Sequence, residues 1–399
     1  MKKEVINYSL KNLKQRKARS FLTIFSILVG IATIFIFISF GWGLYDYTES
    51  FKSGSSADKL LVLTKGASMP GMDETIKLTD DDLRATERTA GVYGATGLYY
   101  DVVRVERKDE SLYTFLTSYD PKKPYIMDLF EADPEVGRFL KPGDKGVIAG
   151  YNYLIPGKIF DDALGINDII EVNGEKLKII GFMENIGNPS DDSQIYVTND
   201  RFLELLPEKD TYAQLIAKVD LENIKKVTEN VEKSLRKSRD IEKGKEDFFV
   251  QSFEDMIDSY AGALDVIIGF VVLIAFISVI VSAVNTANTM ITSVLERYKE
   301  IGILKSIGAR NSDIFSIFLF ESAVLGLIAG GLGTLLGYVL TVFADYVLNS
   351  LGWGFLTPHH SPILFLGCIG FAVLTGAISG AIPAIKASKT NTVDALRYE

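Results

Sequence analysis

Few side chains in this 399-residue sequence have the types and spacing that catalysis or metal binding requires. Its only two histidines are His359 and His360, and no Cys, Asp or Glu lies beside them at the spacing of a metal-ligand set. The acidic runs Asp80–Asp82 and Asp191–Asp192 lack the regularly spaced oxygen ligands of a calcium loop. The first run is better explained as the N-cap and opening turn of a helix, where carboxylates interact favourably with the helix dipole. The sequence therefore predicts no catalytic residue and no metal site.

A charged segment, Glu296–Ala309 (ERYKEIGILKSIGA), is the feature most suited to binding. It lies between two long uncharged stretches, Val266–Leu295 and Ser322–Ala344. A short charged loop between two membrane helices is a place where a partner protein could push on both of them.

The residues of this segment fit such a contact if they form a helix from about residue 294 to 307. One face would carry small apolar side chains: Ile301, Leu304, and either Ile307 or Gly308. Polar contacts would come from the charged residues Glu296, Arg297, Lys299, Glu300 and Lys305. Gly302 permits close approach, and Gly308-Ala309 is typical of a helix end followed by a turn. Taken singly, the charges are equally compatible with an ordinary helix surface.

Four segments meet the criterion for a membrane-spanning helix, about 18 or more consecutive apolar residues. We predict spans at residues 21–44, 264–292, 314–346 and 363–385. The segment 293–313 would connect the second and third spans, and a loop at 347–362 the last two.

Basic residues cluster in the short segments beside these spans, which predicts the orientation of the chain. The N-terminal segment 1–20, the loop 293–313 and the tail 386–399 all carry Lys and Arg, whereas the loop 347–362 has none. We therefore expect a protein of the cytoplasmic membrane with both termini inside and the large segment 45–263 outside.

Charge is distributed unevenly in the same way. The segment 45–263 has 28 Lys and Arg against 42 Asp and Glu, a net charge of −14, while the rest of the chain is net basic. The acidic balance argues against nucleic acid as a partner. The only cysteine, Cys368, lies in the fourth span, so the external domain can form no disulfide.

The first 20 residues combine apolar positions Val5-Ile6, Leu10 and Leu13 with intervening Lys and Arg. This spacing favours a basic amphipathic helix at the inner membrane surface. A solvated basic arm is the alternative.

The external segment changes pattern along its length. Strands are predicted at 59–64, 98–107, 212–219 and 247–253, and helices at 78–89 and 221–239. Between them the chain is rich in glycine and short apolar runs, with a hairpin signal at Asn173-Gly174. The predicted fold class is an α+β membrane protein. Its four helices carry an external βαβ-type mixed α/β unit, into which a β-rich subdomain is inserted at about 127–205.

Small residues in the last two spans predict close helix packing. The glycines concerned are Gly326, Gly330, Gly333, Gly337, Gly376 and Gly380. Their neighbours would be helices of the same chain or of a dimer mate, and we favour the same chain. Glu321, at the start of the third span, needs a partner for its charge, for which Arg310 or Lys305 is expected.

Three separated motifs resemble those of the MacB/FtsX/LolC-type ABC transporter permease family. They are the basic entry Ser9–Ala32, the block Asn285–Tyr338 containing ERYKEIGILKSIGARNSDIF and FLFES, and the ending Gly376–Glu399. With the four-span layout, the resemblance covers nearly the whole chain. One departure is Leu304, where many relatives have a basic residue.

The resemblance implies a dimer of permeases, homomeric or heteromeric, that engages cytoplasmic ABC ATPase subunits through the 296–309 segment. ATP and Mg would then be bound by the ATPase, since no G-x-x-x-x-G-K-[ST] loop occurs in this sequence. Membrane lipid, and an external cargo or accessory protein, are further expected partners. Such machines export substrates, extract lipoproteins or lipids, or transmit mechanical work, and the few spans favour substrates already outside or in the outer leaflet.

A second hypothesis is a membrane-tethered external binding or sensory protein that works without an ATPase. Association with an ABC ATPase distinguishes the two.

Overall fold

A computed structural model describes residues 17–50, 56–65, 76–130, 132–392 and 395. It divides into two compact units, which we call the helical unit and the α/β unit. The helical unit contains residues up to Leu44, Ala263–Val347 and residues from Leu356 onward; the α/β unit contains Tyr45–Gly262 and Leu348–Phe355. The basic segment predicted for residues 1–20 lies almost entirely outside the described residues.

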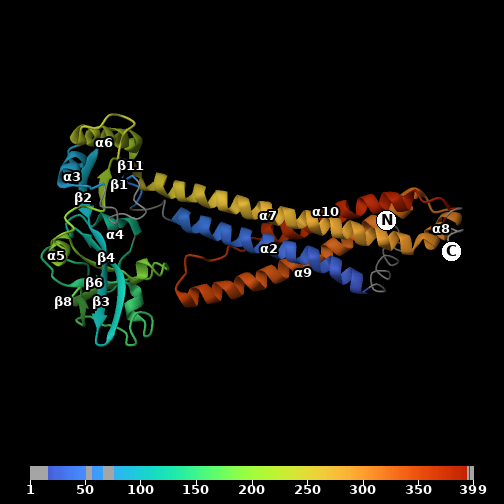
Figure 1. Cartoon of the computed structure of the whole chain (residues 1–399), viewed down its shortest axis with the longest axis horizontal. Helices are drawn as coiled ribbons and strands as arrows, with labels where there is room; N and C mark the ends of the chain where they lie inside the picture. The colour runs from blue at the N-terminus through green and yellow to red at the C-terminus, as the bar shows by residue number, and fades with distance from the viewer. Residues whose placement is uncertain (1–16, 51–55, 66–75, 131, 393–394, 396–399) are drawn as a thin grey trace. The chain divides into compact units, whose positions relative to one another are not determined.

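Four long apolar helices dominate the helical unit (Figure 1). They are α2 (Lys17–Ser50), α7 (Phe253–Glu296), α9 (Asn311–Leu351) and α10 (Pro362–Ser388). All four are long and apolar enough to cross a membrane. The short helix α8 (Tyr298–Ser306) connects α7 to α9. Each long helix contains one predicted span and extends beyond it at one or both ends.

Glycines on α9 bring its backbone against two different helices. A Cβ added at Gly326 would meet the backbone carbonyl of Ala372 on α10. A Cβ at Gly333 would lie 2.7 Å from the carbonyl oxygen of Leu28 on α2, and one at Gly337 would lie 3.0 Å from the Phe35 side chain. Helix α9 therefore packs on α10 at Gly326 and on α2 at Gly333 and Gly337.

The remaining glycines complete the same contacts. Gly330 faces Ala372, Gly376 faces the backbone of Ser322, and Gly380 faces the Ser322 side chain. All six glycines thus lie against helices of their own chain.

The first sheet of the α/β unit has the strand order β11-β1-β10-β2. Its strands are β1 (Lys59–Thr64), β2 (Val92–Leu98), β10 (Gln214–Val219) and β11 (Phe248–Ser252). Neighbouring strands are antiparallel, so β1 and β2 run parallel on either side of β10. Helices α3 (Asp80–Glu87) and α6 (Ile224–Arg239) pack their apolar side chains on this sheet. The predicted βαβ-type unit is confirmed, but its strand β2 was not predicted, and the strand predicted at 98–107 pairs in the second sheet instead.

The second sheet has the order β5-β8-β6-β9-β4-β3-β7. Its strands are β3 (Tyr100–Arg107), β4 (Glu110–Tyr119), β5 (Pro134–Gly137), β6 (Val147–Ala149), β7 (Ile169–Val172), β8 (Glu175–Met183) and β9 (Ile195–Thr198). Short helices α4 (Tyr125–Phe130) and α5 (Asn199–Leu205) and the 3-10 turns Tyr151–Leu154 and Asp191–Ser193 also belong to this part of the unit. A further 3-10 turn, Leu221–Asn223, leads into α6. Asn173 and Gly174 both have positive φ in the turn between β7 and β8, which confirms the predicted hairpin.

The predicted start of the β-rich insertion, about residue 127, is wrong. Strands β3 and β4 precede that position, yet both pair within the second sheet. Strand β4 is parallel to β9, a partner about 80 residues away, and such non-local pairing leaves no local signal in the sequence. The insertion therefore begins near Tyr100.

The α9–α10 connection is shorter than the predicted loop at 347–362, because α9 continues to Leu351. Residues Leu348–Phe355 belong to the α/β unit. Within that unit the Phe355 amide donates to the carbonyl of Gly187 at 3.1 Å, and Lys158 Nζ donates to the carbonyl of Ser350 at 3.3 Å.

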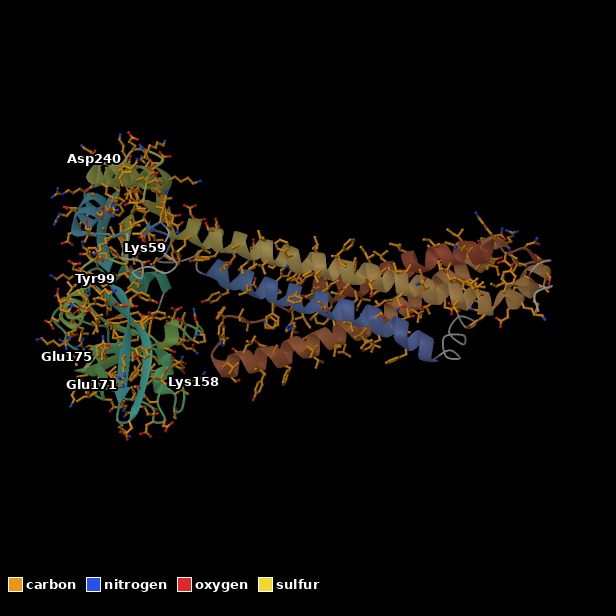
Figure 2. The ribbon with its side chains drawn as sticks, in the orientation of Figure 1. Lys59, Tyr99, Lys158, Glu171, Glu175 and Asp240 are labelled. Atoms are coloured by element: carbon orange, nitrogen blue, oxygen red, sulfur yellow. The ribbon has the colours of Figure 1, made fainter. Side chains whose placement is uncertain are left out.

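A buried lysine joins the first sheet to α4. Lys59, labelled in Figure 2, is the first residue of β1. Its Nζ lies 3.3 Å from an Asp128 carboxylate oxygen and 2.5 Å from an Asp58 carboxylate oxygen. Its Nζ also lies 5.6 Å from the centre of the Tyr125 ring. Because the Lys59 side chain is almost fully buried, these groups must together compensate its charge.

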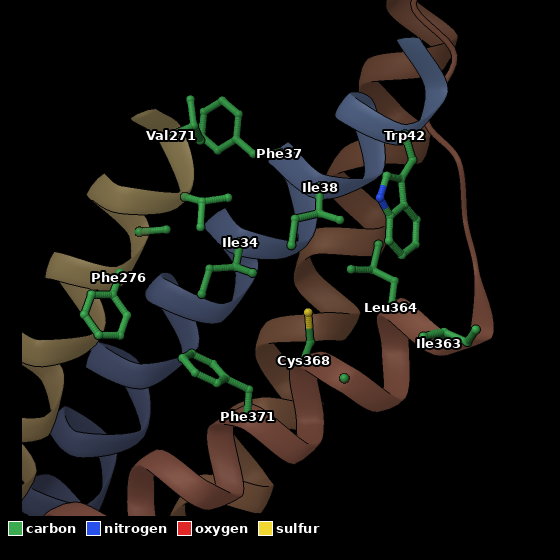
Figure 3. A pocket seen from close by; sticks show the side chains of 13 residues that line it. Ile34, Phe37, Ile38, Trp42, Val271, Phe276, Ile363, Leu364, Cys368 and Phe371 are labelled. Carbon is green, nitrogen blue, oxygen red and sulfur yellow. The ribbon is translucent and has the colours of Figure 1, made fainter. Parts of the chain in front are cut away.

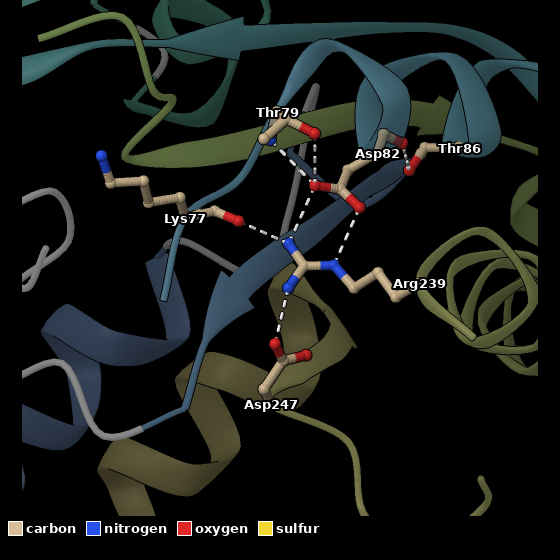
Figure 4. A network of polar contacts seen from close by, with 6 residues as sticks. All are labelled: Lys77, Thr79, Asp82, Thr86, Arg239 and Asp247. Carbon is tan, nitrogen blue, oxygen red and sulfur yellow. Dashed lines mark hydrogen bonds and ion pairs between the residues drawn. The ribbon is translucent and has the colours of Figure 1, made fainter. Parts of the chain in front are cut away.

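A second buried ion pair fixes the ends of α3 and α6 (Figure 4). Arg239 Nε and Nη2 each donate to an Asp82 carboxylate oxygen at 2.8 Å, and Nη1 donates to Asp247 at 2.7 Å. Asp82 also accepts the Thr79 amide at 2.8 Å, which closes the first turn of α3. The run Asp80–Asp82 thus opens α3 as predicted, although Thr79 is the N-cap.

Replacing Asp82 should destabilise the α/β unit more than replacing its neighbour. We expect Asp82→Ala to cost about 3–5 kcal/mol, because it leaves the Arg239 charge largely buried without its main partner. Hydrogen exchange of the α3 and α6 amides should accelerate accordingly. The matched control is Asp81→Ala, whose side chain is 78% exposed. Equal protection factors in the two variants would contradict this role of Asp82.

Enlarging a packed glycine on α9 should destabilise the helical unit. Gly326→Leu must displace the Ala372 backbone, and overpacking of this kind costs about 1–3 kcal/mol. We expect a lower midpoint of thermal unfolding in detergent. Gly331→Leu is the control on the same helix, because a Cβ there meets nothing within 4 Å. The packing argument fails if both variants unfold at the same temperature.

Candidate functional site

Helix α8 occupies the charged segment between α7 and α9. The chain leaves helical geometry at Arg297, with φ −108° and ψ 17°, and α8 then runs from Tyr298 to Ser306. Its end is a Schellman motif: the Ala309 amide donates to the Leu304 carbonyl and the Gly308 amide to the Lys305 carbonyl. Gly308 has φ +105°, which a residue with a side chain rarely adopts. The predicted helix stop at Gly308-Ala309 is therefore present.

One face of α8 is buried within the chain. Ile301 is 2% exposed and belongs to an apolar cluster with Met290, Phe318 and Ala384, while Leu304 packs against the edge of that cluster. Ile301 and Leu304 share a face as predicted, but this face is turned toward α7, α9 and α10. The expectation that their side chains contact a partner is thus wrong for this conformation, because the break at Arg297 separates α8 from α7 and sets its orientation independently.

An ion pair holds the start of α8 against α9. Arg297 Nη1 lies 3.1 Å from Glu321 Oε2, and their side chains are 5% and 6% exposed. Arg297 Nε also donates to Glu300 at 3.2 Å, and its guanidinium lies 5.1 Å from the centre of the Phe318 ring. Arg297 therefore fills the role that the sequence assigned to Arg310 or Lys305 as the partner of Glu321.

Lys305 instead joins α8 to the end of α10. Its Nζ donates to the carbonyl oxygens of Ser388 and Thr390, both at 2.7 Å. These carbonyls lie at the C-terminus of α10, where a cation is favoured by the helix dipole. Helix α8 is thus attached to α9 near its first residue and to α10 near its last.

The opposite face of α8 is exposed and carries both charge and apolar surface. Ile303 and Ile307 are 49% and 77% exposed, and Lys299 lies one turn before Ile303 on the same side. We call Lys299, Glu300, Ile303 and Ile307 the α8 outer face. Ile303 was missed by the sequence prediction, although its i, i+4 spacing between Lys299 and Ile307 was the available signal.

The other predicted residues of the segment lie around this face. Glu296 and Gly308 are exposed, Ala309 is half-buried, and Gly302 is buried beside Ile301. Exposed isoleucines flanked by charges of both signs form a surface that can bind a shallow groove on another protein.

The helical unit also contains an apolar cavity of about 390 Å³ between α2, α7 and α10 (Figure 3). Side chains from all three helices line it, among them Phe37, Trp42, Phe276, Leu364 and Phe371. Its wall is almost wholly apolar, so it suits a hydrocarbon rather than a polar solute.

The histidine pair has structural contacts. The His359 amide donates to the Ser39 carbonyl at 2.9 Å, and a ring nitrogen of His360 lies 2.9 Å from the Thr341 hydroxyl. No group of three or more His, Cys, Asp or Glu residues is placed to hold a metal ion in the part of the chain that the structure describes.

Two family models match this chain and together cover most of it. The model of the MacB-like periplasmic core domain matches residues 20–233, and that of the FtsX-like permease C-terminal matches residues 272–392.

Similar proteins include an uncharacterised ABC transporter permease, MJ1507, of Methanocaldococcus jannaschii. It is 32% identical over 99% of this chain and 98% of its own length. The ABC transporter permease YknZ of Bacillus subtilis is 25% identical over 99% of both chains. The macrolide export ATP-binding/permease protein MacB of Bdellovibrio bacteriovorus is 27% identical, and this chain spans 62% of its length.

Solved structures resemble part of the chain. The extracellular domain of the transporter YknZ from Gram-positive bacteria gives a TM-score of 0.39 at 14% identity, covering 48% of this chain and 99% of that one. The periplasmic region of MacB from Actinobacillus actinomycetemcomitans gives 0.40 at 14% identity, covering 51% and 92%.

The Arg297–Glu321 pair should be strongly coupled. Glu321→Leu alone leaves the buried guanidinium without its main partner, and we expect a loss of about 3–5 kcal/mol in stability. Adding Arg297→Met should recover most of this loss, because both charges are then gone. The wild type, the two single variants and the double variant form a double-mutant cycle. Their free energies of unfolding are measured by adding increasing SDS to the detergent-solubilised protein. Lys299→Met is the control at an exposed position. Additive effects of the two substitutions would show that the pair is not coupled.

Proposed function

Because the chain belongs to the family of MacB-like and FtsX-like ABC transporter permeases, we propose that it is the membrane subunit of an ABC transporter driven by a separate ATPase. ATP and Mg²⁺ would be bound by that ATPase. The relatives MJ1507 and YknZ support a permease that is separate from its ATPase, because both are named permeases and match over nearly their full length.

The observation that carries the proposal is the two-sided construction of α8. Its outer face offers exposed Ile303 and Ile307 to a partner, while Arg297 and Lys305 on its inner side hold α9 and α10. A partner that moves α8 must therefore also move these two helices or break buried polar contacts. We propose that the ATPase binds the α8 outer face and that its ATP-driven motion passes through these contacts.

The proposed orientation places α8 and both termini in the cytoplasm and the α/β unit outside. Lys and Arg flank the helices on the α8 side, whereas the loop between α9 and α10 has none. This orientation gives a cytoplasmic ATPase access to α8.

We further propose that the permease works as a dimer. Only 17% of the most apolar part of α7 is buried within the chain, compared with 39% for each of the other three long helices. The exposed side chains of α7 include Phe270, Leu273 and Phe276. A second permease and membrane lipid are the proposed neighbours of this surface.

The apolar cavity supports a substrate of low polarity. Its lining comes from α2, α7 and α10 near Trp42, and tryptophan is enriched where membrane helices meet the interface. We propose that the transporter acts on a lipid-like molecule in the outer leaflet, by export, extraction or mechanical displacement.

Charging the α8 outer face should abolish ATPase binding without unfolding the chain. The double variant Ile303→Glu with Ile307→Glu changes two exposed side chains, so we expect the midpoint of thermal unfolding to stay unchanged. The amount of ATPase that co-purifies with the tagged permease should fall at least tenfold. ATP turnover that depends on the permease should fall in parallel. The measurement uses the chain co-expressed with the ABC ATPase encoded beside it.

Ile303→Val with Ile307→Val is the matched control, because it keeps the face apolar and should retain binding. If the glutamate variant binds the ATPase as well as wild type does, the outer face is not the contact. If wild type itself retains no ATPase, the reading as a membrane-tethered sensory protein takes precedence.

A further inference from the structure

A second cavity, of about 340 Å³, lies inside the α/β unit. Its wall combines β1, β2 and β10 of the first sheet with β3 and β4 of the second, and α4 and the first turns of α7 contribute apolar side chains. This volume falls in the range of small-molecule sites, which are commonly found where two substructures meet.

Aromatic rings form part of the wall. Tyr100 and Phe115 lie on adjacent strands and stack with their ring centres 4.9 Å apart and an interplanar angle of 19°. Phe253 and Tyr260 of α7 line the cavity as well, and Tyr260 is 60% exposed. The faces of such rings carry partial negative charge and attract cations.

One carboxylate stands in this aromatic wall. Asp191 accepts hydrogen bonds from the side-chain amides of Asn188 at 2.8 Å and Gln194 at 3.2 Å. Both donors are neutral, and no Lys or Arg lines the cavity among the described residues. The Asp191 charge therefore has no cation to balance it within the cavity.

The surroundings of Asp191 disfavour its ionised form. Burial, and then the neighbouring Asp192 carboxylate, raise the pKa of Asp191 to about 6. The other ionisable groups that face it are the phenols of Tyr47, Tyr100 and Tyr196, which are uncharged at neutral pH. A cation placed beside Asp191 would relieve this repulsion and desolvation.

We propose that the cavity between the two sheets binds a small amphipathic cation, an ammonium group attached to an apolar or aromatic body. The ammonium lies against Asp191 and the Tyr100–Phe115 stack, and the apolar body fills the space toward Met256 and Phe253. An anion would meet Asp191 without a compensating donor of positive charge, and a neutral hydrocarbon would leave the carboxylate unbalanced. The site is independent of the α8 outer face and of the cavity in the helical unit.

Benzyltrimethylammonium is the probe for the test, with benzyl alcohol as a neutral comparison and benzoate as an anionic one. Binding is measured by ligand-observed NMR on the full chain in nanodiscs, with empty nanodiscs subtracted to remove partitioning into lipid. The wild-type chain should prefer the cation to both comparison compounds by at least tenfold.

Two variants locate the site by different means. Asp191→Asn removes the charge and keeps the shape, and Met256→Trp fills the cavity and keeps the charge; each should weaken binding of the cation at least tenfold. Asp81→Asn, which removes a carboxylate on the surface of the same unit, should leave binding unchanged.

The proposal is overturned if benzoate or benzyl alcohol binds the wild-type chain as tightly as the cation, or if a folded variant at Asp191 or Met256 binds normally. Should Asp191→Asn fail to fold, the ligand preference of wild type and the effect of Met256→Trp still decide the question.

Discussion

Backbone contact along α9 is the constraint on which the helical unit depends. In lipid, the hydrophobic effect does not drive one apolar helix against another, so association relies on close packing. Gly326 lets α9 approach α10, and Gly333 lets it approach α2 from a different face. Because both contacts include backbone atoms, no change of rotamer on either side can make room for a larger residue. Helix α9 is therefore the shared element against which the others are positioned.

The polar contacts of α8 depend on that arrangement. Arg297 can be buried only because α9 brings Glu321 to it, and Lys305 finds its acceptors only because α10 ends beside α8. Losing either contact would leave a charge in an apolar setting, which is costly. On the outer face of α8, Glu300 also contacts Arg297, whereas the side chains of Ile303 and Ile307 are exposed. The side chains that hold α9 and α10 thus lie on the opposite side of one short helix from its exposed isoleucines.

Features with a local physical cause were predictable from the sequence. Apolar runs identified the four long helices, Lys59–Thr64 was found as a strand to the residue, and Asn173-Gly174 marked its hairpin. Features that depend on distant partners were not. Strand β4, and with it β3, belongs to the second sheet because β4 pairs with β9. The partner of Glu321 is determined by the break in the helix at Arg297. The position of the charged segment was predictable, but which of its faces is exposed was not, because periodicity identifies a face without saying what covers it.

The packing of α2 also has a consequence for the order of assembly during synthesis. Ser39 of α2 is hydrogen-bonded to the backbone of His359, a residue 320 positions further along the chain. Helix α2 is made before the other three long helices, yet its contact with α9 forms only after the last third of the chain has been made. Until then it must stay in the bilayer through its own apolar character, while the α/β unit between α2 and α9 is already being synthesised. Its uninterrupted hydropathy therefore serves biogenesis before it serves the finished bundle.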